Sequence, residues 1–110
     1  MKIVIHISLD TLMAANEILK EIYNLPVSLD KRENVYKSIG FDLADKFDGK
    51  CKTQIKKANL FENKKIKISL MYHEAWALEE IIQDLSDIVK NDYRKALLLN
   101  LTNIINQKIV

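Results

Sequence analysis

Apolar and polar residues alternate in two short stretches of the chain, residues 2–8 and residues 65–71. One face of each stretch is apolar and carries Ile3, Ile5 and Ile7 in the first, and Ile66, Ile68 and Leu70 in the second. The other face is mostly polar, with Lys2, Val4, His6 and Ser8 in the first stretch and Lys65, Lys67, Ser69 and Met71 in the second. Alternation at a period of two is typical of a strand with one buried face. The pattern therefore predicts two strands.

Each predicted strand is followed by two stretches in which apolar residues recur every three or four positions, which predicts helices. After the first strand the apolar stripes are Leu12, Ala15, Leu19 and Ile22, then Val35, Ile39, Leu43 and Phe47. After the second strand they are Ala75, Leu78, Ile82, Leu85 and Val89, then Leu97, Leu101 and Ile105 in a helix that begins near Asn91 or Asp92. Pro26 predicts the end of the first helix, because proline disfavours helical geometry in the residue before it.

Residues that cap helices occur where the first two helices are expected to start. Asp10 can cap the first helix. Ser28 or Asp30 can cap the second, and Glu33 is placed for a capping box. The segment "LPVSLDKRE" is therefore predicted to hold both the end of one helix and the start of the next.

The two halves of the chain also match each other residue by residue. A shift of 63 positions places Ile5 on Ile68, and a shift of 62 places Lys46 on Lys108. A chance match in a chain rich in Ile and Lys is the alternative explanation, but the shared order of strand and helix signals favours a duplication. The repeats then span about residues 2–47 and 65–109, joined by a linker at about residues 48–63.

The linker "DGKCKTQIKKANLFEN" can be interpreted in two ways. Cys51, Ile55 and Ala58 keep a helical spacing, so the second helix can extend past Gly49. The alternative is a loop between the repeats. The sequence leaves both open.

One β-α-α copy cannot bury its apolar strand face, and a lone strand leaves its backbone groups unpaired. Two copies solve both problems if their strands pair antiparallel about a pseudo-twofold axis and four helices cover the isoleucine face. The predicted fold is therefore a single mainly α domain over residues 1–110, with a two-stranded antiparallel β-ribbon and a duplicated β-α-α repeat.

Composition narrows the class of protein further. A chain of 110 residues suits one domain. Cys51 is the only cysteine, which excludes an intrachain disulfide and fits a reducing compartment. No apolar run approaches the roughly 18 residues that a membrane helix needs. The start "MKIVIHIS" alternates and does not resemble the core of a signal peptide, so we expect a cytoplasmic protein.

Signals for an enzyme are weak. The stretch "HEAWA" begins like a zinc-protease helix, but Ala77 stands where the second histidine is required. Three aspartates, Asp42, Asp45 and Asp48, lack the alternating spacing of a calcium loop. We therefore predict no catalytic residue, no metal site and no cofactor.

The order strand–helix–helix, the start "KIVIHISLD" that leads straight into a helix, and the turn "LPVSLDKRE" resemble the ribbon-helix-helix DNA-binding fold. The resemblance covers about residues 2–47 and 65–109 and implies a tandem, single-chain version. It also implies that the paired strands enter the major groove of DNA and that the start of each second helix touches phosphate. The usual Gly and paired Ser between the helices are absent here, and Val4 and Met71 place apolar groups on the implied reading face.

The resemblance assigns the reading of DNA to polar residues of the two strands, because Lys can donate to guanine acceptors in the major groove. These candidates are Lys2, His6, Lys65, Lys67 and Ser69. For the lysines, the alternative role is to keep an exposed face soluble and to prevent pairing at the strand edges.

Two arginines occupy equivalent positions in the first turns of the second and fourth predicted helices. Arg32 follows Lys31, and Arg94 precedes Lys95. A cation at a helix start lies at the positive end of the helix dipole, which is mildly unfavourable. One explanation is an anion such as a DNA phosphate held there by free backbone N–H groups. The other is an ion pair with a nearby carboxylate.

Charge is distributed unevenly. Residues 46–67 hold eight Lys and two acidic residues, whereas residues 73–88 hold five acidic residues and neither Lys nor Arg. The basic run can contact phosphates, lie in a solvated loop, or pair with the acidic helix of another copy. We expect a homodimer from these opposite local charges.

The leading interpretation is a small DNA-binding protein that regulates transcription. The alternative is a non-enzymatic protein-interaction or self-assembling module of a phage or mobile element. Trp76 is the candidate contact for a protein partner in that alternative, and its other expected role is to anchor the core.

Overall fold

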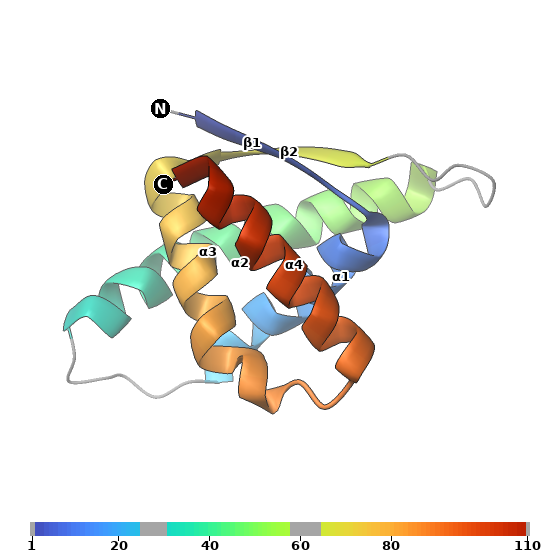
Figure 1. Cartoon of the computed structure of the whole chain (residues 1–110). Coiled ribbons are helices and arrows are strands. Elements are labelled where there is room, and N and C mark those ends of the chain that lie inside the picture. The colour runs from blue at the N-terminus through green and yellow to red at the C-terminus, as the bar shows by residue number, and fades with distance from the viewer. Residues whose placement is uncertain (1, 25–30, 58–64, 110) are drawn as a thin grey trace.

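The computed structural model of the chain describes residues 2–24, 31–57 and 65–109 (Figure 1). The elements are β1 (Lys2–Ile7), α1 (Leu9–Lys20), a 3-10 turn η1 (Glu21–Asn24), α2 (Lys31–Lys57), β2 (Ile66–Met71), α3 (Tyr72–Leu85), a 3-10 turn η2 (Ser86–Ile88) and α4 (Asp92–Ile109). This order confirms the predicted mainly α domain with a duplicated β-α-α arrangement. Among the described residues, no helix is long and apolar enough to span a membrane.

The two strands pair antiparallel, as the alternation predicted. Ile5 lies opposite Ile68, and these two residues are also equivalent in the two copies. The pair Ile3–Leu70 is equivalent to the pair Ile7–Ile66 when the copies are exchanged. The register is therefore symmetric about the Ile5–Ile68 pair, which is the point where a pseudo-twofold axis crosses the ribbon.

The apolar face of the ribbon is buried against the helices. Its members are at most 8 % exposed and comprise Ile3, Ile5, Ile7, Ile66, Ile68 and Leu70. Figure 1 shows the ribbon across the top of the molecule with the helices below it. Helix α2 packs against both α1 and α3, and α4 packs against α1, α3 and β1. Helices of the two copies thus share one hydrophobic core.

The helix starts differ in part from the expected caps. Ser8, not Asp10, caps α1: its backbone is extended, and its Oγ accepts a hydrogen bond from the Thr11 N–H at 3.2 Å. The chain enters α1 directly from β1, so Asp10 already falls inside the first turn. At α4, the Oδ1 of Asn91 accepts from the Tyr93 and Arg94 N–H groups at 2.9 and 3.2 Å, as a cap at this position requires. The cap candidates Ser28 and Asp30 lie outside the described residues.

Helix α2 runs through Gly49 to Lys57, so the first ten residues of the expected linker are helical. The physical reason is burial, because Cys51 is 4 % exposed and continues the stripe of Leu43 and Phe47. The predicted apolar stripe of α2 is wrong at its first residue, because Val35 is 52 % exposed. The first turns of α2 project beyond the rest of the helices (Figure 1).

Gly40 marks the place where α2 crosses the core most closely. A Cβ at this position would lie 2.7 Å from the Ile81 Cδ1 and 2.9 Å from the Ile22 Cδ1. Gly49, in the same helix, has nothing within 4 Å of such an atom. Gly40 therefore permits a close helix approach, whereas Gly49 has no packing role in the described structure.

Candidate nucleic-acid interface

The outward surface of the ribbon brings together five of the residues predicted to read DNA. We call this surface the ribbon face, and it comprises Lys2, Val4, His6, Lys65, Lys67, Ser69 and Met71. His6 lies opposite Lys67, and Val4 lies opposite Ser69. The lysines and His6 are exposed, whereas Val4 and Ser69 are half-buried. The strand period places all of them on the side opposite the isoleucines.

A groove of about 440 Å³ lies where the ribbon face meets α2. We call it the basic groove, and it is lined by Lys2, Lys46, Lys50, Lys67, Ser69, Leu70, Met71 and Glu74. The Lys46 ammonium donates a hydrogen bond to the backbone oxygen of Ser69 and lies 3.6 Å from the Glu74 Oε1. Glu74 also accepts from the Met71 N–H at 2.8 Å, where α3 begins. Four lysines and one carboxylate line the groove, so its local charge is positive.

Lys46 and Lys50 were not among the candidate site residues, although the sequence carried a signal for them. Both belong to the basic run at residues 46–67, and they lie four positions apart. Residues with this spacing share one face of a helix. The signal depends on α2 continuing past Gly49, which the sequence left open and the structure decides.

The repeat provides a counterpart to Lys46 on the other side of the ribbon. Lys108 occupies the equivalent position in the last turn of α4 and is exposed. Helix α4 packs against β1 and ends beside the ribbon (Figure 1). Lys46 therefore contacts the β2 side of the ribbon, and Lys108 belongs to the last turn of a helix that packs against β1.

Arg94 forms an ion pair with a carboxylate, which is the second of the two explanations for its position. Its guanidinium donates to the Glu17 Oε2 of α1, and both side chains are about half exposed. Beside it, the Tyr93 hydroxyl donates to the Asp10 Oδ2 at 2.9 Å. This hydrogen bond raises the pKa of Tyr93. The start of α4 is thus tied to α1 of the other copy.

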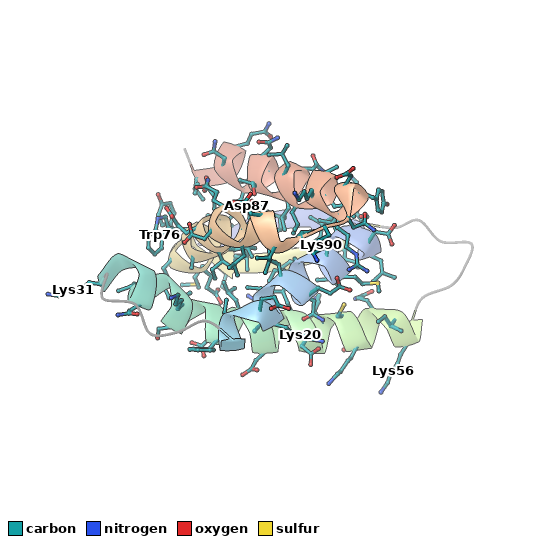
Figure 2. All side chains as sticks on the ribbon, turned by 90° about the horizontal axis from the view of Figure 1, so that it is seen from below. Lys20, Lys31, Lys56, Trp76, Asp87 and Lys90 are labelled. Carbon is teal, nitrogen blue, oxygen red and sulfur yellow. The ribbon has the colours of Figure 1, made fainter. Side chains whose placement is uncertain are left out.

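The other candidates at helix starts are placed as follows. Lys31 is exposed, and in Figure 2 its side chain points away from the end of α2. Lys95 is exposed on α4. The backbone of Arg32 is helical, but its side chain lies outside what the structure describes.

The structure does not bring these helix starts onto the ribbon face. In Figure 1 the ribbon lies at the top, whereas α2 begins at the lower left and α4 at the lower right. Figure 2 views the molecule from the side away from the ribbon, and Lys90, just before α4, faces the viewer there. Among the described lysines of the helices, Lys46 and Lys50 line the groove beside the ribbon instead.

The remaining candidates provide no chemical site. Trp76 is half-buried and packs against the core, which fits the role of an anchor. Cys51 is buried, and that burial raises its pKa, so its thiol stays protonated at neutral pH. Over the described residues, no three His, Cys, Asp or Glu side chains are arranged to hold a metal ion.

Comparison with known proteins identified no relative of this chain. No family model matches the sequence, and no match is found among the curated proteins or the solved structures.

Proposed function

We propose that this protein binds duplex DNA through the ribbon face and acts as a small regulator. The observation that carries the proposal is the gathering of lysines on and beside one exposed ribbon, namely Lys2, Lys46, Lys50, Lys65 and Lys67. The β-α-α-β-α-α order with paired strands supports a tandem ribbon-helix-helix arrangement.

The geometry of the ribbon suits the major groove. That groove admits a two-stranded ribbon, and side chains on its outer face reach the base edges. Helices cover the inner face, so the ribbon is held rigid while Lys2, His6 and Lys67 remain in solvent. In this proposal Lys67 reads bases, and its replacement changes which sequence is preferred.

The phosphate contacts in this proposal differ from those that the family resemblance implied. Lys46 contacts β2 and Lys108 lies in the last turn of the helix that packs against β1, whereas Arg94 forms an ion pair with Glu17 at a helix start away from the ribbon. Contacts to phosphate fix a protein on the duplex without reading its sequence. Lys46, Lys50 and Lys108 therefore take the positioning role. A phosphate would also replace Glu74 as the partner of Lys46.

The test is duplex binding measured by fluorescence anisotropy across a series of salt concentrations. Lys50→Ala should weaken binding to all sequences alike and reduce the salt slope by about one unit, because one phosphate contact is lost. Lys31→Ala is the matched control, since it removes the same charge from an exposed lysine of the same helix at the end away from the ribbon. It should leave the slope unchanged.

Two results would contradict the proposal. If Lys31→Ala lowers the slope and Lys50→Ala does not, the helix starts hold the phosphates and the ribbon face is not the binding surface. If the unmodified protein binds no duplex with salt-dependent affinity, the alternative of a protein-interaction module takes its place.

A further inference from the structure

The outer surface of α4 carries no charge over most of its length. Residues 96–107, "ALLLNLTNIINQ", contain no Asp, Glu, Lys or Arg. The side chains of this segment that face solvent are Ala96, Leu99, Asn100, Asn103, Asn106 and Gln107. Leu99 is 63 % exposed, the largest value among the exposed large apolar side chains of the described residues. Depletion of charge around an exposed apolar residue is typical of the core of a protein interface.

The other copy of the repeat shows that the fold does not require this surface. The position equivalent to Leu99 is Lys37 in α2, and the position equivalent to Gln107 is Asp45. A lysine is thus accommodated at the same place in the same arrangement of helices. Leu99 has no structural need to be apolar, so its character fits a role in binding.

A groove of about 480 Å³ lies beside Leu99, between α3 and α4. Its apolar floor is formed by Ile82, Leu98 and Leu99. The polar residues that line it are Glu79, Gln83, Ser86, Asp87, Lys95, Thr102, Asn103 and Asn106. Glu79 accepts a hydrogen bond from Gln83 at 3.4 Å within the same helix. The groove therefore has an acidic wall formed by Glu79 of α3 and Asp87 of η2, a basic residue on α4 and an apolar floor.

The charges on this groove are those of a self-complementary surface. Asp87 and Lys95 both line it, and among the described residues neither forms an ion pair within its own chain. A twofold interface brings the same patch of two molecules together, so each residue meets its complement twice. In such a dimer Lys95 faces the acidic wall of the second copy, and Leu99 faces the apolar floor.

We propose that two copies of this chain associate isologously through the outer surface of α4 and the groove between α3 and α4. The occupant of the groove is the Leu99 side chain of the second copy, with Lys95 against Asp87 at both ends of the interface. Helix α4 lies on the flank of the molecule, opposite α2 in Figure 2, so the dimer leaves the basic groove uncovered. The proposal is therefore independent of DNA binding.

The first experiment measures molar mass by sedimentation as the protein concentration is raised. The unmodified chain should change from 12.8 kDa to twice that mass and no further. Leu99→Lys should remain a monomer, and the lysine at the equivalent position 37 indicates that the fold tolerates it. Ile55→Lys is the matched control: Ile55 is 52 % exposed on α2, so the same substitution there should leave the dimer intact.

A second experiment tests the charge pairing between molecules. Lys95→Glu alone and Asp87→Lys alone each place like charges opposite each other and should be monomeric. An equal mixture of the two variants should restore the dimer, because both contacts in the mixed dimer again join opposite charges. An interaction within one chain cannot be rescued by mixing.

Several outcomes would overturn the proposal. They are an unmodified protein that stays monomeric at high concentration, growth beyond a dimer, loss of the dimer in Ile55→Lys, and a mixture of the charge variants that remains monomeric. Circular dichroism of each variant establishes that it is folded before its mass is interpreted.

Discussion

Helices α2 and α4 occupy equivalent positions in the two copies, yet their exposed surfaces differ. The part of α2 equivalent to residues 96–107 of α4 carries Lys37, Asp42 and Asp45, and Lys46 and Lys50 just beyond it line the basic groove, whereas residues 96–107 carry no charge. Helix α2 also continues for ten residues past Phe47, the equivalent of Ile109 where α4 ends. The difference teaches what a tandem repeat permits. In a homodimer of short chains every substitution appears twice, but here each copy can acquire a surface of its own.

The buried residues of α2 and α4 should differ less in their effect on stability than the exposed surfaces differ in composition. The exception is expected near the C-terminal ends of the two helices. Phe47 is fully buried in the core in the interior of α2, whereas its equivalent Ile109 is half-buried in the last turn of α4. Phe47→Ala should lower the free energy of unfolding by about 3–5 kcal/mol, as large-to-small changes in a core do. Ile109→Ala should lower it by much less. Urea denaturation measures both, and equal losses would mean that the ends of α2 and α4 are packed alike.

The two glycines of α2 compare the buried and the solvent-exposed parts of that helix. Gly40→Ala places a methyl group 2.7 Å from the Ile81 Cδ1 and 2.9 Å from the Ile22 Cδ1, and the overpacking cost of about 1–3 kcal/mol should exceed the roughly 1 kcal/mol that alanine gains in a helix. Gly49→Ala meets no neighbour and should stabilise the protein by up to about 1 kcal/mol, because alanine favours a helix. The change in thermal midpoint should therefore have opposite signs. A stabilising Gly40→Ala would show that α2 can move away from α3 at little cost.

The first helices of the two copies differ in how they begin. Ser8 caps α1 with its side chain, whereas its equivalent Met71 has no such side-chain bond and α3 instead relies on Glu74. Ser8→Ala should cost about 1 kcal/mol, the usual value of an N-cap. Asp10→Ala, two residues further on in the first turn of α1, should cost less because its carboxylate is exposed and accepts a hydrogen bond from the exposed Tyr93. A larger loss in Asp10→Ala would restore Asp10 as the residue that secures the start of α1.

The ion pair between α4 and α1 should contribute little to stability. Arg94 and Glu17 are both about half exposed, and such pairs are worth about 0–1 kcal/mol. Arg94→Ala should therefore fold normally and should also leave the salt slope of DNA binding unchanged, because Arg94 lies away from the ribbon face. The same titrations used for Lys50→Ala measure this. A slope reduced by one unit would return Arg94 to the DNA interface.

The smallest expected effect is a dependence of stability on alkaline pH. The hydrogen bond from Tyr93 to the Asp10 carboxylate raises the pKa of the phenol above its ordinary value of 10.0. A folded-state pKa above the unfolded one stabilises the protein at lower pH, and this contribution is lost as the pH rises past the unfolded value. The contribution is intact below the unfolded pKa, so Tyr93→Phe should remove the part of the fall in urea midpoint that occurs above about pH 10. Parallel profiles for the two proteins would show that the hydrogen bond has no energetic weight.

Sequence patterns were sufficient for the ribbon and for most of the helical stripes. Alternation assigned the isoleucines to the buried face, and a slip of one residue would have exposed all of them. They were insufficient for Val35, because its exposure depends on how far α2 projects past its neighbours. They were also insufficient for Ser8 and Asp10, since either residue type caps a helix and only the path of the chain out of β1 decides between them.

The residues of the candidate site also fall into two groups, those that the sequence pattern placed and those that only the tertiary structure placed. The strand period placed Lys2, His6 and Lys67 on one surface without reference to the rest of the molecule. Nothing in the local sequence pairs Arg94 with Glu17, which is 77 positions earlier, or Lys46 with the backbone oxygen of Ser69. Those partners are set by how elements of the two copies pack against each other, α4 against α1 and α2 beside β2.

The sequence by itself therefore determined the elements, their order and the buried face of each strand, because periodicity is a property of consecutive residues. The tertiary structure alone decided that α2 continues to Lys57, since the burial of Cys51 against the core outweighs the low helix propensity of Gly49. The tertiary structure also decided which basic residues lie beside the ribbon. In Figure 1, α2 and α4 begin away from the ribbon, so the first turn of α4, which holds Arg94, is not beside it, whereas Lys46 further along α2 contacts β2.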